Sequence, residues 1–204
     1  MPFSKLVDAF RGGDAAAGNE LLGRYRPWLK LLARLQGEGS LPGKFDGSDI
    51  VQQTMLEAFR AASQFLGHSE AEFATWLRQI LAHALQHEIR RYRGTEKRDV
   101  SREVSIDDEL NRSSDRLRAL LAADEPSPSQ KAILNEQEVL LADILERLPD
   151  DYREVIVLRN LQNLSHEEVA RRMNRGLGAV RMLWVRALAR LRKEIKSQEG
   201  GGNN

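Results

Sequence analysis

Apolar residues recur every three or four positions along most of this chain, which is the spacing of one face of an α-helix. No sustained alternation of apolar and polar residues, the pattern of a half-buried strand, stands between turn signals. We therefore predict an all-α protein. Its first helix carries an apolar stripe from Phe3 to Phe10 and ends at Gly12-Gly13. Asp14 caps a longer second helix whose stripe runs from Leu21 to Leu35.

Two further helices complete a first domain, which we place at residues 1–94. Residues 37–47 hold four glycines and Pro42, which indicates a loop. Ser48 then caps the third helix. The segment from Ser69 to Glu72 has the form of a capping box, in which serine and glutamate oxygens accept hydrogen bonds from free amides of the first turn. It opens a long fourth helix.

A charged, serine-rich segment at residues 95–132 follows this domain. It contains the acidic trio Asp107-Asp108-Glu109 and the helix-breaking run from Glu125 to Ser129. We interpret it as a charged flexible linker with a helix around residues 112–123. Helical periodicity resumes at residue 133, so we place a second helical domain at residues 133–197 and a disordered tail at residues 198–204.

The second domain contains the pattern of a helix-turn-helix. Ser165 and Glu168 form another capping box, which fixes the start of a helix of about two turns. A turn follows at Asn174-Arg175-Gly176, and a longer helix begins near Leu177. A short helix, a turn with glycine and a longer helix are typical of this DNA-binding motif.

The longer helix has an apolar and an outward side. Its apolar stripe comprises Leu177, Val180, Trp184, Leu188, Leu191 and Ile195. The outward positions are Gly178, Arg181, Met182, Val185 and Arg186. Residues 171–196 hold nine basic residues and one acidic residue, whereas residues 136–168 hold nine acidic and three basic. This split favours a DNA-binding face, although a helical hairpin with a solvated basic face would show the same charges.

Composition limits the other functions of the chain. The 31 lysines and arginines nearly balance 30 aspartates and glutamates, so any surface that attracts nucleic acid must be local. Cysteine is absent, which excludes disulfides and thiolate zinc ligands. No stretch approaches the roughly 20 apolar residues that span a bilayer, so we expect a cytoplasmic protein without membrane contact.

Several segments resemble one protein family in order and in spacing. Leu148–Ile156, Leu164–Ala170 and Gly178–Arg181 resemble region 4 of extracytoplasmic-function (ECF) sigma factors of the sigma-70 family. Ser48–Phe59 and Phe73–Ile80 resemble region 2 of the same family. The resemblance implies a non-enzymatic subunit that binds core RNA polymerase and directs promoter-specific initiation, without a cofactor or a metal. Region 4 would read the −35 element, and region 2 would read and melt the −10 element.

The resemblance also implies roles for particular residues. In region 4, DNA contacts are expected from Arg175, Gly178, Ala179, Arg181, Met182, Val185, Arg186 and Arg190. In region 2, contacts with melted promoter DNA are expected from Arg78, His83, His87, Arg90 and Arg91, on the outer face of the fourth helix. Core polymerase would be contacted by Asp49, Gln52, Gln53 and Glu57. Without the resemblance, these last four would read as an ordinary solvated helix face.

Some positions depart from the family pattern. His83 stands where asparagine is usual, and Met182-Leu183 replace serine and arginine. Leu183 would therefore remove a phosphate contact, which Arg175 partly offsets, while Met182 suits a thymine methyl group. The loop from Leu66 to Glu72 would hold a flipped base. Trp76 could serve as its stacking platform, but its place on the stripe of Phe73 and Ile80 favours a core position.

Two other functions were weighed. His83, His87 and Glu88 share a helix face that could bind zinc, but their order differs from the zinc-protease motif and a third ligand is not evident. A dimeric operator-binding regulator could use the same helix-turn-helix, but it would need a ligand pocket or dimer interface in the first domain. We expect a monomer when free, with domains that pack together and mask their basic faces. The sequence leaves open whether an anti-sigma factor is a further partner.

Overall fold

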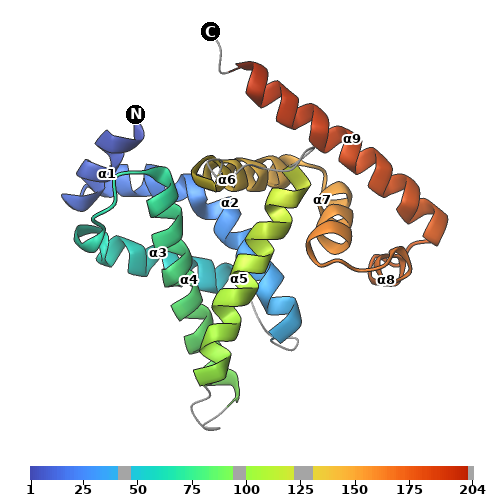
Figure 1. The fold of residues 1–204 in the computed structure, drawn as a ribbon, viewed down its shortest axis with the longest axis horizontal. Coiled ribbons are helices and arrows are strands. Elements are labelled where there is room, and N and C mark those ends of the chain that lie inside the picture. Colours follow the sequence, from blue (N-terminus) through green and yellow to red (C-terminus); the bar gives the residue numbers. More distant parts are fainter. Residues whose placement is uncertain (41–46, 94–99, 122–130, 202–204) are drawn as a thin grey trace.

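The computed structural model describes residues 1–40, 47–93, 100–121 and 131–201, and within these ranges every regular element is helical (Figure 1). The predicted all-α class is confirmed. The elements are α1 (Phe3–Arg11), α2 (Ala15–Ser40), α3 (Gly47–Arg60), η1 (Ala62–Gln64), α4 (Glu70–Arg93), α5 (Val100–Leu121), α6 (Lys131–Arg147), α7 (Asp150–Ile156), the π-helical turn η3 (Val157–Leu161), α8 (His166–Arg172) and α9 (Leu177–Gly201). None of the described helices is long and apolar enough to cross a membrane.

Helices α1 to α4 form an N-terminal lobe around an aromatic core. Phe73 is fully buried at the centre of this core. The centroid of its ring lies 5.1 Å from the ring centroids of both Tyr25 and Phe65. The Asp14 carboxylate accepts hydrogen bonds from the backbone N–H groups of residues 16 and 17, at 2.8 and 3.0 Å, as its predicted capping role requires. The predicted caps and apolar stripes thus bring four helices onto one core.

Helix α2 is longer than predicted. It continues through residues 37–40, part of the predicted loop, while residues 41–46 lie outside the described part. Each glycine inside a helix costs about 1 kcal/mol relative to alanine. Leu32, Ala33 and Gln36 just before this stretch are buried, so tertiary packing holds the helix against that propensity.

The connecting segment contains a helix that packs on both sides. Helix α5 begins at Val100, about three turns before the predicted helix, and it contacts α2, α4, α6 and η3. Leu110, Ser114 and Leu117 are fully buried in these contacts. In Figure 1, α5 runs through the middle of the view. This part of the segment is therefore folded, and residues 94–99 and 122–130 are outside the described part.

Helices α6 to α9 form a C-terminal lobe, with the long α9 along its outer side (Figure 1). Leu145, Leu158, Val169 and Val180 are buried in its core. Helix α9 continues to Gly201, so residues 198–201, predicted to be disordered, are helical here. Residues 202–204 of that predicted tail are outside the described part.

We expect Phe73→Ala to lower the free energy of unfolding by about 3–5 kcal/mol, because it opens a cavity in the aromatic core. The matched control Leu66→Ala truncates a side chain that is 79% exposed and should change stability by less than about 0.5 kcal/mol. Urea unfolding followed by circular dichroism measures both. Equal effects from the two substitutions would contradict the placement of Phe73.

Candidate nucleic-acid interface

The predicted helix-turn-helix is confirmed in α8, the turn at residues 173–176 and α9. Both hydrogen bonds of the Ser165 capping box are present: Ser165 N–H donates to Glu168 Oε2 at 2.8 Å, and Glu168 N–H donates to Ser165 Oγ at 3.2 Å. The hydrogen bond from the Ser165 backbone N–H, together with a hydrogen bond from the Ser165 side chain, holds the pKa of Glu168 below its ordinary value. Asn174 adopts a positive φ of 50°, which turns the chain between the helices.

Side-chain packing fixes which side of α9 faces solvent. Val180, Ala187 and Leu191 are buried against the rest of the lobe, and Trp184 and Leu188 pack on the same core. The eight residues predicted to contact DNA are all exposed: Arg175, Gly178, Ala179, Arg181, Met182, Val185, Arg186 and Arg190. The exposed fractions of Met182 and Val185, 59% and 52%, leave apolar surface available on a basic face.

Leu183 corrects the sequence analysis. Leucine in place of the family's arginine was expected to remove a phosphate contact, but the Leu183 side chain is only 4% exposed. Residue 183 follows Val180 by three positions, so it belongs to the same buried stripe. The buried face of α9 is wider than the predicted one and includes both residue 183 and residue 184. An arginine here would have to leave the core before it could reach a phosphate.

Polar contacts place α9 and its arginines. Trp184 Nε1 donates to Asn160 Oδ1 at 2.9 Å, which ties α9 to η3. Arg181 Nη2 lies 3.5 Å from Glu167 Oε1 of α8, and both side chains are 59% exposed. Ion pairs this exposed are weak, so Arg181 remains free to exchange its carboxylate for a base edge. The sequence analysis did not find Glu167, which adjoins the capping glutamate.

Arg175 and Arg190 are also paired. Arg175 Nη2 lies 2.5 Å from Asp151 Oδ2 of α7, and Arg190 Nη2 lies 2.7 Å from Glu194 Oε1 one turn along α9. These side chains are 41% and 52% exposed, respectively. Phosphates would therefore compete with side-chain carboxylates for both cations, in a solvent-accessible setting where each pair contributes about 0–1 kcal/mol.

The outer side of α4 carries a second cationic surface. His83, His87, Arg90 and Arg91 are exposed there, as predicted. Arg78 differs, because its side chain is only 15% exposed and lies at the contact with the C-terminal lobe. The family resemblance implies an outer position for Arg78, and neither that resemblance nor the spacing within α4 shows where α5 and α6 pack.

A pocket of about 370 Å³ lies beside this surface, lined by residues that include Phe65, Gly67, Glu72 and Trp76. A Cβ atom on Gly67 would stand 2.6 Å from Phe65 Cζ, so only glycine fits there. Arg11 braces the same loop by donating its Nε–H to the Phe65 carbonyl at 2.7 Å. The sequence analysis did not identify Arg11, because no local pattern links it to a loop 54 residues away.

Trp76 has the core position that its place on the stripe favours, and part of it lines the pocket. It packs on the N-terminal core, with its ring 5.5 Å from that of Phe73, and it also lines the pocket. The pocket rim is held by the Ser69 capping box, in which the Glu72 carboxylate accepts from the backbone N–H groups of His68 and Ser69 at 2.9 and 3.0 Å. The hydrogen bond from the His68 backbone is the largest cause that lowers the pKa of Glu72, and the hydrogen bonds from Ser69 lower it further.

Helix α3 presents the four residues assigned to polymerase docking. Asp49 and Gln52 are exposed, while Gln53 and Glu57 are half-buried. Gln53 Nε2 donates to Glu57 Oε1 at 3.0 Å, which orders one edge of the face. Ile50, Val51, Thr54 and Ala58 are buried on the opposite side, so the docking side is turned outward.

The zinc alternative gains no support from the described residues. Within those ranges, no three histidine or acidic side chains come together in a way that could hold a metal ion. His83 and His87 are exposed on α4 instead.

Comparisons with known proteins agree with this geometry. The profile for Sigma-70 region 2 matches residues 21–95, and the profile for Sigma-70, region 4 matches residues 138–191. The ECF RNA polymerase sigma-E factor of Escherichia coli (strain K12) is 31% identical over 184 residues, which cover 89% of this chain and 88% of that protein. The chain belongs to the sigma-70 family, in its ECF group.

Other sigma-70 relatives match over nearly the whole chain. The ECF RNA polymerase sigma-E factor of Haemophilus influenzae is 28% identical over 193 residues, or 94% of each protein. Among solved structures, a chain of the RsbN-BldN complex is 24% identical, with 92% of this chain and 97% of that chain covered and a TM-score of 0.31. Region 2 of this sigma factor thus falls largely in α2 to α4, and region 4 in α6 to α9.

The lowered pKa of Glu168 predicts a pH-dependent contribution of the capping box in region 4. The carboxylate form accepts the hydrogen bonds, so its contribution is complete above the ordinary pKa of 4.5 and is lost as the pH falls through the lower folded-state pKa. Glu168→Gln should therefore be less stable than the unchanged protein at pH 7. That difference should shrink below pH 4.5. Urea unfolding at pH 7, 5, 4 and 3 checks this, and a pH-independent difference would contradict it.

Proposed function

We propose that this protein binds core RNA polymerase as its promoter-specificity subunit, with region 4 reading the −35 element and region 2 reading and melting the −10 element. The observation that carries this proposal is the outward side of α9, where exposed cations and apolar groups face solvent while the opposite stripe is buried. The family match and the polar outer side of α3 support a polymerase-dependent role rather than that of an operator-binding regulator.

The exposed side of α9 has the chemistry for reading bases in the major groove. An arginine can donate two hydrogen bonds to guanine O6 and N7, and an apolar side chain can contact the methyl group of thymine. Arg181 and Arg186 supply the first kind of group, and Met182 and Val185 supply the second. Arg175 in the turn and Arg190 further along α9 are both exposed and would contact phosphates.

The surface of region 2 suits a melted strand. Arg90 and Arg91 supply charge that offsets phosphate repulsion, and His83 and His87 add donors on the same side of α4. The pocket lined by Trp76 and Glu72 would receive an unstacked base. A base that leaves the duplex needs both stacking and hydrogen bonds to offset the lost pairing, and this pocket provides both kinds of group.

Further partners follow from the same proposal. The polymerase makes the RNA, so this subunit needs no catalytic residue, cofactor or metal of its own. It would act in the cytoplasm, where the polymerase works, and as a monomer when free. An anti-sigma factor would have to cover the docking side of α3 or the reading side of α9 to inhibit it.

Reconstitution tests the function directly. Purified core enzyme with this protein should start transcripts at selected promoters in a run-off assay, whereas core enzyme alone should not. Gln52→Ala combined with Gln53→Ala should weaken binding to core enzyme by about tenfold, because it removes polar contacts from the docking side. Lys5→Ala, which truncates an exposed residue of α1, is the control and should bind as the unchanged protein does.

If the protein were an operator-binding regulator, the same experiments would give the opposite results. In that case the protein alone would footprint a specific DNA site, core enzyme would gain no promoter-specific transcripts, and the two glutamines could be replaced without effect. That set of results would overturn the proposal.

Arg181 and Arg190 should differ in their effects on promoter choice. Arg181→Ala should relax preference at one −35 base pair, at a cost of roughly 1–3 kcal/mol for the preferred base. Arg190→Ala should weaken binding evenly across sequences, as the loss of a phosphate contact does. Anisotropy titrations of the reconstituted holoenzyme on a set of −35 variants measure both. Uniform losses from both substitutions would contradict the assignment.

A further inference from the structure

Arg11 is the last residue of α1, and its side chain reaches the loop that connects η1 to α4. Its Nε–H donates to the Phe65 carbonyl at 2.7 Å, and its Nη2–H donates to the Gly67 carbonyl. The third nitrogen, Nη1, lies 3.5 Å from Asp8 Oδ1, less than one turn earlier in α1. All three nitrogens of the guanidinium are thus engaged, and its planar shape fixes the two carbonyls relative to each other.

Helix α1 holds Arg11 in a fixed position. Leu6, Val7 and Phe10 are buried in the N-terminal core, and Gly13 has a φ of 83°, which turns the chain just beyond the helix. The Arg11 side chain is only 22% exposed. Its hydrogen bonds replace the water that this burial removes, and they give partners to loop carbonyls that belong to no helix. The loop is therefore attached to a packed helix.

The Arg11 contact continues into the wall of the pocket. The guanidinium carbon of Arg11 lies 5.3 Å from the centroid of the Phe65 ring, and that centroid lies 5.2 Å from the ring centroid of Trp76. Phe65, Gly67 and Trp76 all line the pocket. A Cβ atom on Gly67 would also stand 2.8 Å from Glu72 Cβ, so the loop has little room to shift. Releasing the loop from Arg11 would therefore change the shape of the pocket.

Arg11 acts on this pocket from outside it. It is not one of the residues that line the pocket, and it lies before residue 21, where the match to the region 2 profile begins. A loop that must be ordered when a ligand arrives lowers the affinity for that ligand, whereas a loop ordered beforehand does not. Arg11 can therefore raise the affinity of the pocket without touching its occupant.

We propose that Arg11 is a positioning residue for promoter opening. By holding the carbonyls of residues 65 and 67, it keeps one wall of the pocket in place before a base leaves the duplex. This role rests on the proposed function, in which the pocket receives an unstacked base, whereas the brace itself does not.

Hydrogen exchange in the free, full-length protein tests the brace. Arg11→Met removes the donors and keeps a side chain of similar reach, so amides of residues 65–69 should exchange about tenfold faster. Lys5→Met makes the same charge change at an exposed position of the same helix and should leave that exchange unchanged. Unchanged exchange in Arg11→Met would overturn the brace.

A series of abasic promoters tests the role in opening. Each promoter lacks one base of the non-template strand in the −10 element, and the position whose loss most weakens binding of the unchanged holoenzyme marks the base in the pocket. Arg11→Met should bind the intact promoter about tenfold more weakly. On the marked abasic promoter the two proteins should bind equally, because the wall has no base to hold. Binding to core enzyme should not change, since α3 is untouched.

The same series excludes a direct contact between Arg11 and DNA. An abasic nucleotide keeps its phosphate, so a phosphate contact would make Arg11→Met weaker by the same factor on every promoter. Arg11→Lys keeps the charge but not the planar fork, so it should lose about threefold on the intact promoter and nothing on the marked one. If Arg11→Met unfolds in urea titrations at much lower denaturant than the unchanged protein, Arg11→Lys carries the test.

Three results would overturn the positioning role. They are equal losses on intact and marked promoters, no loss on the intact promoter, and a −10 element in which no single base matters to the unchanged holoenzyme. If the proposed function fails instead, the unchanged protein forms no promoter-specific holoenzyme, and the role in opening falls with it. Hydrogen exchange in the free chain would still report whether Arg11 holds the loop.

Discussion

Each functional helix of this protein can bury only one stripe, and that constraint decides which side chains are available to a partner. On α9, Val180, Leu183 and Leu191 are held in the core, which turns Arg181 and Met182 to solvent. On α3, the burial of Val51 and Thr54 turns Asp49 and Gln52, on the side proposed for docking, to solvent. A rotation of either helix by one residue, about 100°, would move its functional side against the core. The recognition chemistry therefore depends on apolar packing behind it.

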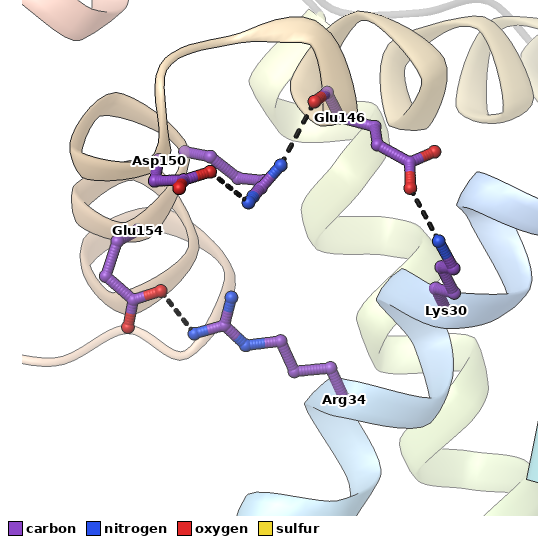
Figure 2. A network of polar contacts seen from close by, with 6 residues as sticks. Lys30, Arg34, Glu146, Asp150 and Glu154 are labelled. Atoms are coloured by element: carbon purple, nitrogen blue, oxygen red, sulfur yellow. Dashed lines mark hydrogen bonds and ion pairs between the residues drawn. The ribbon is translucent and has the colours of Figure 1, made fainter. Parts of the chain in front are cut away.

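The contact between the lobes adds a second level to this arrangement. Surface ion pairs such as Lys30–Glu146 (Figure 2) contribute little each, about 0–1 kcal/mol, and weaken as salt rises. The buried Glu138 is different, because a buried carboxylate that loses its partners is costly. Opening the lobes must therefore rehydrate Glu138 and release its partner Arg78 together. The exposed side of α9 and the outer side of α4 remain open to solvent, contrary to the expected masking of basic faces.

Much of this could be predicted from the sequence, because it is encoded locally. The capping boxes at Ser69 and Ser165 and the apolar stripes are short-range signals, and they located α4, α8 and α9 correctly. The outward set on α9 followed from the same periodicity. The errors at Leu183 and Arg78 have another cause, since the width of a buried stripe and the packing of α5 and α6 on α4 depend on tertiary contacts. The loop brace by Arg11 and the ion pairs between the lobes were missed for the same reason.

We infer that two sides of this small protein act on different partners at the same time. Site-specific photocrosslinking in one reconstituted promoter complex tests this most directly, with the crosslinker placed at position 53 of α3 or at position 181 of α9. We predict that position 53 crosslinks to the large subunits of the polymerase and position 181 to DNA at the −35 element. Crosslinks from both positions to the same partner, or from position 181 back into this chain, would contradict the account.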